Sequence, residues 1–147
     1  MKKDEMLTLH RNVMDAWNSH DTEKFAAYCD PQIEWRDPDY PAPLKGVGQA
    51  RDFSTGWLNA FPDLKINTLN TVVGDNTIVA ELEFTGTHKG ALVVGENRHQ
   101  IDPTHKKVKS YGCYVATVKD GKYTSVHTYP DRAGLMMQLG ILDLEHA

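Results

Sequence analysis

The sequence has few cysteines and no clustered metal ligands. Its two cysteines, Cys29 and Cys113, lie far apart and do not form a Cys-x-x-Cys pair. Two such residues cannot provide a disulfide framework, so we expect a reducing compartment. The seven histidines are scattered, and no two of them show the local spacing of a zinc motif. The sequence therefore predicts no bound metal.

Long apolar segments and basic clusters are also lacking. No stretch could span a bilayer, and the first ten residues, MKKDEMLTLH, carry acids where a signal peptide has an apolar run. The formal net charge is −4, and basic residues form no cluster larger than pairs such as Lys106-Lys107. Nucleic acid and anionic membranes attract strongly basic surfaces. We therefore expect a cytoplasmic protein that binds neither of them.

The chain is long enough for one domain with its own core. A chain of 147 residues can bury about 68–70% of its unfolded surface, so we treat residues 1–147 as a single domain. Helical patterns come first and runs of β-branched and aromatic residues follow, which predicts an α+β fold with helices on one face of an antiparallel sheet. The expected helices cover 4–19, 22–28, 48–60 and a segment after Asp131; the expected strands cover 33–37, 64–73, 77–88 and both arms of 108–131, with an extended loop over 89–105.

The strongest local signal is Asp120-Gly121, which lies between two runs rich in β-branched and aromatic residues. Asp-Gly favours a two-residue type I′ turn, and such a turn sets the pairing of both strands. Lys119 would then face Lys122. One face of the sheet would carry the pairs Val118 with Tyr123, Ala116 with Ser125, Tyr114 with His127, Gly112 with Tyr129 and Ser110 with Asp131. This face is apolar near the turn and polar near its far end, which suits a pocket better than a solid core.

The opposite face of this hairpin is expected to be apolar. It would carry Tyr111, Cys113, Val115 and Val126. An exposed apolar patch usually has a partner, so we expect a homodimer formed through this face.

A second hairpin is expected around residues 74–76. A two-residue turn at Asp75-Asn76 would pair Val73 with Ile78 and Leu69 with Leu82. Gly74-Asp75 is a competing turn, so the register here stays open.

Six short motifs resemble those of one superfamily. They are DAWNSHD, EWRDP, AFPDL, FTGTHKG, VKDGK and YPDRAGLMMQLGIL, and they follow one another through nearly the whole chain. Their order resembles the nuclear-transport-factor-2-like superfamily and, within it, the SnoaL-type polyketide cyclase and ester cyclase group. The resemblance implies a conical fold, in which a curved antiparallel sheet surrounds a pocket and helices close its concave face. It also implies a homodimer.

The resemblance to the cyclases implies one acid/base residue. In that group it is an aspartate at the end of the last strand, before a helix of the QLG type, which here is Asp131. Such enzymes close a polyketide ring by intramolecular aldol addition without a metal or an organic cofactor. A carboxylate in an apolar pocket can abstract an activated C–H proton and return it to the new alkoxide. His127 and Tyr114 would steady the enolate oxygen. The alternative is that Asp131 only caps the last helix.

The related ketosteroid isomerases imply a different base. They place it in a first-strand Asp-Pro motif, which here is Asp37-Pro38. Their oxyanion hole needs a helical tyrosine and a protonated aspartate, and these positions are Val13 and Tyr114 in this chain. The missing helical tyrosine weakens an isomerase assignment, although Asp37 could still act as a base with Tyr114 as a donor. The alternative is that Asp37 forms an Asx-type turn before the Pro-rich loop.

The remaining candidates are expected to contact a small hydrophobic substrate. They are His88, Tyr129, Trp35, Trp17, Phe84 and Ser110. For His88 the alternative is a histidine satisfied by backbone at a strand end, and for the tryptophans it is a place in the core. A metal site formed by His88, His127 and Asp131 is conceivable but disfavoured. Three functions stay open: a cyclase-type enzyme, a non-catalytic binding module, and a dimeric scaffold with a vestigial pocket.

Overall fold

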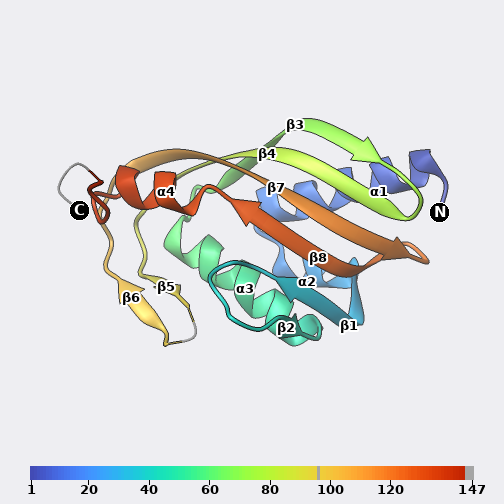
Figure 1. Cartoon of the computed structure of the whole chain (residues 1–147), viewed down its shortest axis with the longest axis horizontal. Coiled ribbons are helices and arrows are strands. Elements are labelled where there is room, and N and C mark those ends of the chain that lie inside the picture. The colour runs from blue at the N-terminus through green and yellow to red at the C-terminus, as the bar shows by residue number, and fades with distance from the viewer. Residues whose placement is uncertain (96, 145–147) are drawn as a thin grey trace.

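The fold is one curved sheet with helices against its concave side (Figure 1). The computed structural model describes residues 1–95 and 97–144. The main sheet has the strand order β2-β1-β8-β7-β4-β3, so the β7–β8 hairpin lies near its centre, and the predicted α+β class is confirmed. The elements are α1 (Lys3–Asn18), α2 (Thr22–Ala27), β1 (Cys29–Arg36), β2 (Leu44–Lys45), α3 (Val47–Ala60), β3 (Lys65–Val73), β4 (Thr77–Thr87), β5 (Leu92–Val94), β6 (His99–Ile101), β7 (Lys107–Lys119), β8 (Lys122–Pro130) and α4 (Arg132–Gln138).

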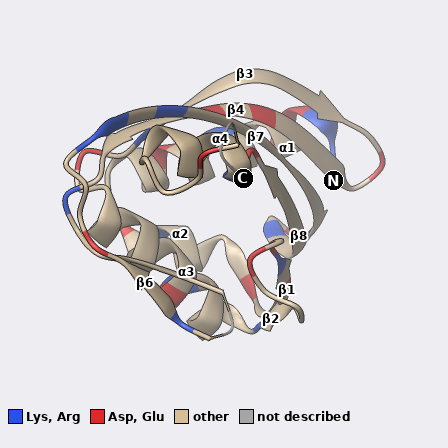
Figure 2. Cartoon of the chain, turned by 60° about the vertical axis from the view of Figure 1, so that its left-hand side comes forward, with Lys and Arg blue, Asp and Glu red and all other residues tan. Residues whose placement is uncertain are grey.

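The helices form where the apolar spacing and the caps predict them. Met6, Leu9, Val13 and Trp17 lie three or four residues apart in α1, and all four are buried. The Asp21 carboxylate accepts a hydrogen bond from a backbone N–H in the first turn of α2 and so caps that helix. The sheet arches over α1, while α2 and α3 lie across from it (Figure 2).

Strand β1 pairs in parallel with β8, whereas the other neighbouring strands of the main sheet are antiparallel. The expected sheet was wholly antiparallel, and this pair is the exception. Parallel neighbours need a long crossover, and here more than half of the chain, from β2 through β7, separates the two strands. Ile33, Trp35 and Asp37 occupy alternate positions of the predicted strand 33–37, and all three are buried.

The β3–β4 hairpin has the predicted pairing only beside its turn. Val73 pairs with Ile78, as the two-residue turn predicts. A bulge at Leu69 then shifts the register by one residue, so Leu82 lies opposite Thr68. The predicted pairs further from the turn are therefore wrong.

The β7–β8 hairpin departs from its predicted register in the same way. Asp120 and Gly121 have φ of +52° and +78°, as a type I′ turn requires, and the predicted pairs next to the turn are present. Thr124 is then an extra residue in β8, so each later pair is shifted by one position. Tyr114 lies opposite Thr128, not His127. The shifted pairs also include Val115 with His127, Cys113 with Tyr129 and Gly112 with Pro130.

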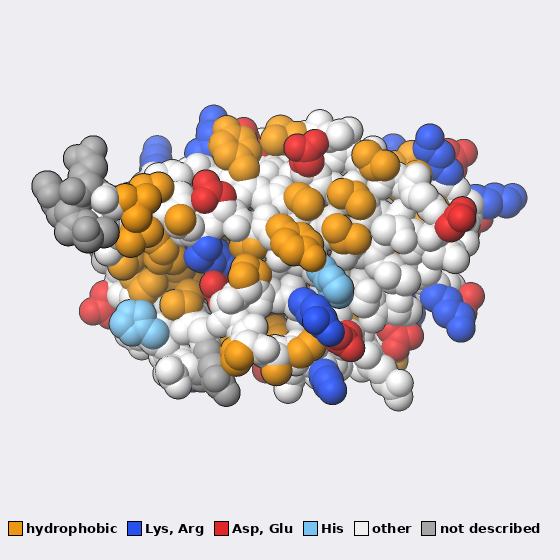
Figure 3. All heavy atoms as spheres, viewed as in Figure 1, with side chains coloured by type: hydrophobic (Ala, Val, Ile, Leu, Met, Phe, Trp, Pro, Cys, Tyr) orange, Lys and Arg blue, Asp and Glu red, His pale blue; other side chains and the backbone are white. Residues whose placement is uncertain are grey.

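This shift changes what each face of the hairpin carries. His127 lies next to Thr128 in the strand, so it points away from the face that carries Tyr114. Val126, predicted on the outer face, is instead buried inside. Tyr111 and Tyr129 are 50% and 59% exposed on the outside. Hydrophobic side chains gather over β7 and β8 on the surface that Figure 3 shows.

The segment predicted as an extended loop contains a short hairpin of its own. Strands β5 and β6 pair, with Leu92 opposite Ile101, and both of these side chains are buried. Burial of two apolar residues explains why this segment is ordered without a regular pattern in its sequence. Glu96, between the two strands, lies outside the described residues. Within the described part of the chain, no helix is long and apolar enough to cross a membrane.

Candidate functional site

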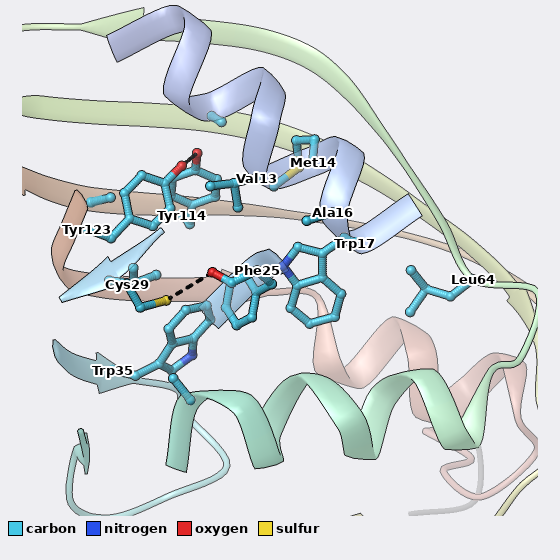
Figure 4. Close-up of a cluster of buried hydrophobic side chains, with 14 of the residues drawn as sticks. Val13, Met14, Ala16, Trp17, Phe25, Cys29, Trp35, Leu64, Tyr114 and Tyr123 are labelled. Carbon is cyan, nitrogen blue, oxygen red and sulfur yellow. Dashed lines mark hydrogen bonds between the residues drawn. The ribbon is translucent and has the colours of Figure 1, made fainter. Parts of the chain in front are cut away.

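A cavity of about 170 Å³ lies between the concave face of the sheet and helices α1 and α3. Its walls are mostly apolar, and Figure 4 shows side chains from α1, β1, β7 and β8 converging on this region. Aromatic rings contact one another in series around it. Their centroid separations are 5.3 Å for Trp17–Phe25, 5.8 Å for Phe25–Trp35, 5.3 Å for Trp35–Phe53, 6.4 Å for Phe53–Trp57 and 6.0 Å for Trp57–Phe84. Each ring packs against the next, so the contacts fix the positions of these rings around the cavity.

The structure brings six of the ten predicted site residues to the cavity wall. They are Tyr114, Asp37, Trp35, Trp17, Phe84 and Ser110. The other four do not line it: Asp131, His127, Tyr129 and His88. The placement of these four in the pocket was wrong. For Asp131, His127 and Tyr129 it depended on the unshifted register of β8. His88 is buried beyond the end of β4 instead.

Asp131 serves as the cap of the last helix. Its Oδ1 atom accepts a hydrogen bond of 2.9 Å from the N–H of Gly134, and the residue is exposed. This is the alternative role that the sequence left open. His127 is half-buried on the outer side of the sheet, so it cannot share a ligand with Tyr114 in the way predicted.

His88 is fully buried at the end of β4, away from the cavity. Its Nδ1 atom accepts a hydrogen bond of 3.1 Å from the backbone N–H of Thr104. Its ring stacks on Phe61 at a centroid distance of 5.4 Å. Burial lowers the pKa of His88, which favours the neutral ring. The histidine therefore ties the segment before β7 to the end of β4.

Asp37 is the carboxylate that reaches the cavity. Its side chain is only 2% exposed. The Thr128 hydroxyl donates to its Oδ2 at 2.7 Å, and the backbone N–H of Asp39 donates to its Oδ1 at 2.9 Å. The second bond is the Asx-type turn that the sequence offered as the alternative. Asp37 thus forms the turn and lines the cavity at the same time.

A cation joins this carboxylate to a second one. Arg132, the first residue of α4, donates from Nε to Asp39 at 3.0 Å, and its Nη2 lies 2.9 Å from Asp39 and 3.6 Å from Asp37. Its guanidinium also lies 4.7 Å from the centre of the Trp57 ring. Burial raises the pKa of Asp39, and the charge of Arg132 opposes that rise. Arg132 therefore links α3, α4 and the loop after β1 beside the cavity.

A chain of hydrogen bonds at another part of the cavity was not predicted. The Nδ1 atom of His10 lies 2.5 Å from the Tyr114 hydroxyl, which lies 2.6 Å from the Tyr123 hydroxyl. The Nε2 atom of His10 lies 2.8 Å from the Thr68 hydroxyl. Burial, with a smaller contribution from Arg11, lowers the pKa of His10. Burial raises the pKa values of Tyr114 and Tyr123, so all the members of the chain are neutral at pH 7.

The sequence held a signal for His10. It follows Met6 by four residues and precedes Val13 and Met14 by three and four, which places it on the buried stripe of α1. A polar ring on an apolar stripe needs a partner, and that requirement could have directed attention to it. The partners themselves come from β3, β7 and β8, so no local pattern names them. Among the residues that the structure describes, no His, Cys, Asp and Glu side chains cluster as a metal site would require.

Comparison with known proteins identifies the family of this chain. A model of the SnoaL-like polyketide cyclase family matches residues 7–139. The chain belongs to this family. A search among curated proteins gave no match.

Solved structures share the SnoaL-like fold at low sequence identity. TsrD from Streptomyces laurentii has a TM-score of 0.83 and 21% identity, over 97% of this chain and 99% of that one. A proposed SnoaL-like polyketide cyclase from a Jannaschia species has a TM-score of 0.81 and 17% identity, over 95% and 94%. A proposed ketosteroid isomerase from Kribbella flavida has a TM-score of 0.65 and 15% identity, over 88% and 80%. At these identities the likeness shows the fold alone, so the reaction must be argued from the cavity.

Proposed function

We propose that this SnoaL-like protein is a cofactor-free acid/base enzyme that acts on a hydrophobic, enolisable small molecule. The observation that carries the proposal is the Asp37 carboxylate, which is 2% exposed at the wall of a mostly apolar cavity. A carboxylate shielded from water can take a proton from an activated carbon that the cavity holds against it. Asp37 replaces Asp131 as the candidate base.

The reaction that fits best is an intramolecular aldol addition. Asp37 removes a proton from the carbon next to a carbonyl group, and the electron pair of that C–H bond forms an enolate. The enolate carbon bonds to a second carbonyl carbon of the same molecule, and the alkoxide formed there takes the proton back from Asp37. The carboxylate is restored, so the cycle consumes no co-reactant. Return of the proton to a different carbon, without ring closure, would make the protein an isomerase.

The pairing of β7 with β8 brings the base near a hydrogen-bond donor. Thr128, which donates to Asp37, is the direct cross-strand partner of Tyr114. Side chains at such paired positions have Cβ atoms about 4.5–5.5 Å apart. The Tyr114 and Thr128 side chains therefore lie on the same face of the sheet, and Asp37 and Tyr114 line one cavity. A substrate that spans this cavity would meet a proton acceptor and a phenol that can donate to an enolate oxygen.

A non-catalytic binding module is the second candidate. It is favoured by the contacts of Asp37, whose two oxygens already accept hydrogen bonds from Thr128 and Asp39. Arg132 adds its charge at 3.6 Å. A carboxylate with these partners can be purely structural, and the cavity would then bind a ligand without turning it over.

Hydrogen exchange separates the two candidates. A panel of hydrophobic ketones in D₂O is followed by NMR for loss of the protons next to the carbonyl group, and binding is followed by tryptophan fluorescence. Asp37→Asn should slow the exchange by about 10²–10⁴ and leave binding in place. Asp131→Asn is the matched control, because asparagine also caps helices well and should leave the exchange rate unchanged.

Each other outcome has a clear meaning. Ketones that bind but exchange no faster than in buffer would identify a binding module. If Asp131→Asn slowed hydrogen exchange and Asp37→Asn did not, Asp131 would be the base.

A further inference from the structure

The hydroxyl group of Thr128 has two acceptors within reach but only one hydrogen. Its Oγ1 atom lies 2.7 Å from Oδ2 of Asp37 and 3.2 Å from the backbone carbonyl oxygen of Arg36. A threonine hydroxyl donates one hydrogen and can also accept through its own oxygen. Hydrogen bonds to charged acceptors are the stronger ones. The hydrogen therefore points to Asp37 while that carboxylate is ionised.

The two oxygens of Asp37 differ in how their partners can respond to a proton. Oδ1 accepts from the backbone N–H of Asp39 at 2.9 Å, and Nη2 of Arg132 lies 3.6 Å from it. Both of these groups can only donate, so a hydrogen on Oδ1 would oppose theirs. The partner of Oδ2 is a hydroxyl group, which can donate or accept. A proton on Oδ2 can therefore be donated to Thr128, whose own hydrogen turns to the Arg36 carbonyl.

The backbone places this second acceptor where the hydroxyl can use it. Arg36 and Asp37 are consecutive residues at the end of β1, and Arg36 pairs with His127, the neighbour of Thr128 in β8. The Asp37 side chain is only 2% exposed, so water does not readily replace a partner that is lost. A buried polar group without a partner is costly. The arrangement gives Oδ2 a partner in both protonation states.

We infer that Thr128 is a positioning residue for the base: its hydroxyl donates to Oδ2 of Asp37 before proton abstraction and accepts from it afterwards, when the Arg36 carbonyl takes the hydroxyl hydrogen. The inference rests on the proposed function, because it concerns how the same carboxylate carries the proton. The proton taken from the substrate carbon resides on Oδ2. Its return to the product reverses both changes, so no proton is gained or lost. Thr128 acts through Asp37 alone.

The first test follows the Asp37 carboxyl carbon by NMR as the pH of the ligand-free protein is changed, and Asp37→Asn identifies its signal. Thr128→Val keeps the shape of the side chain and removes the hydroxyl. It should raise the pH midpoint of the titration by about one unit, because the bond to the carboxylate is roughly twice as strong as the bond from the neutral acid. Thr128→Ser keeps the hydroxyl and should restore the wild-type midpoint.

A matched control is the same replacement elsewhere in β8. The Thr124 hydroxyl donates to the Thr117 carbonyl, so Thr124→Val should leave the midpoint unchanged. The titratable groups that interact with Asp37 are Asp39 and Tyr40 in the loop after β1 and Arg132 in α4. None of them is replaced in these variants, so a shift reports on the hydroxyl.

The Arg36 carbonyl carbon reports on the second acceptor. Its NMR signal should follow the titration of Asp37, and the change should be larger in the wild-type protein and in Thr128→Ser than in Thr128→Val. For a ketone that exchanges hydrogen, Thr128→Val should shift the pH dependence of the rate in the same direction. It should also lower kcat about tenfold and change KM less than about twofold, because the base is misplaced while binding is kept.

An unchanged midpoint in Thr128→Val would overturn the inference, and so would a Thr128→Ser midpoint equal to that of Thr128→Val. An Arg36 signal that changes equally in the wild-type protein and in Thr128→Val would overturn it as well. Thr128→Ala serves if Thr128→Val does not fold. The titration needs no substrate, so its outcome is separate from that of the proposed function. The expected titration without any hydrogen exchange refutes the proposed function alone. Exchange that depends on Asp37 with an unchanged titration in Thr128→Val refutes this inference alone.

Discussion

Replacing Arg132 with methionine tests what holds the two carboxylates beside the cavity. Methionine keeps most of the aliphatic stem and removes the guanidinium, which lies 2.9 Å from Asp39 and 3.6 Å from Asp37. Removing one partner of a buried ion pair costs about 3–5 kcal/mol. The side chain of Arg132 is 21% exposed, so water replaces part of the lost interaction. We expect a loss of about 2–3 kcal/mol at pH 8, or about 5–10 °C in Tm.

The loss should depend on pH with a definite sign. Burial raises the pKa of Asp39, and Arg132 is the group that opposes the rise. Without Arg132, the pKa of Asp39 lies further above the value in the unfolded chain, about 3.9. A carboxyl group whose folded-state pKa is raised destabilises the fold fully above that pKa, and the penalty decreases as the pH falls below it toward the unfolded-state pKa. The difference between variant and wild-type protein should therefore shrink between pH 8 and pH 5.

Urea unfolding at both pH values measures this effect. The double variant Arg132→Met with Asp39→Asn removes both the cation and the charge left behind, so it should recover part of the stability that Arg132→Met loses at pH 8. Arg132→Lys keeps the charge but loses the paired contacts that Nε and Nη2 make with Asp39. Its free energy of unfolding should lie between those of the wild-type protein and Arg132→Met. An equal loss at pH 8 and pH 5, with no recovery in the double variant, would refute the electrostatic reasoning.

Three further predictions concern the fold and its assembly. Gly90→Ala places a Cβ atom 2.1 Å from a carbonyl oxygen of α3 and should cost about 1–3 kcal/mol in urea unfolding, whereas Gly74→Ala, with open space around it, should be close to neutral. Burial lowers the pKa values of His10 and His88 below about 6.5, so stability should fall as pH drops below that value, and His10→Leu should flatten the dependence of Tm on pH. We propose that two copies pair through the outer face of the sheet; Tyr129→Glu should then give a monomer by light scattering, and a wild-type protein that is already monomeric at high concentration would contradict the pairing.

Local patterns were enough to predict the helices and the sequence of the long strands along the chain, although not all of the pairings between them. The stripe of Met6, Leu9, Val13 and Trp17 gave α1 because helical spacing and burial coincide there. Asp120-Gly121 gave the central hairpin because few other residues accept two positive φ angles in succession. These features depend on neighbours in the sequence.

The parallel pairing of β1 with β8 and the β5–β6 hairpin were not predictable in this way. The first joins two strands that are more than 80 residues apart in the sequence. The second depends on the burial of Leu92 and Ile101 under other parts of the fold. His10 was missed for the same reason, because its partners Tyr114 and Thr68 lie on distant strands.

The bulge at Thr124 had the largest consequence for the site, and contacts from outside the hairpin accompany it. Within the hairpin, the Thr124 hydroxyl donates to the carbonyl of Thr117 at 3.1 Å; the other contacts come from outside it. The N–H of Tyr123 donates to the carbonyl of Tyr28 at 2.8 Å, and the N–H of Val118 donates to the carbonyl of Asn76 at 2.9 Å. Backbone groups at the irregular point thus find partners in segments far away in the sequence, which offsets the loss of regular pairing.

The shifted register is also the one that completes the site. It turns Thr128 toward the inside, where its hydroxyl donates to Asp37 at 2.7 Å. In the unshifted register His127 would occupy that face, Thr128 would point outward, and the buried Asp37 carboxylate would lose a donor. A single extra residue in β8 therefore decides whether a histidine or a threonine faces the base. The turn sets the hairpin, and the bulge, whose flanking backbone groups bond to Tyr28 before β1 and Asn76 before β4, determines which side chains the cavity receives.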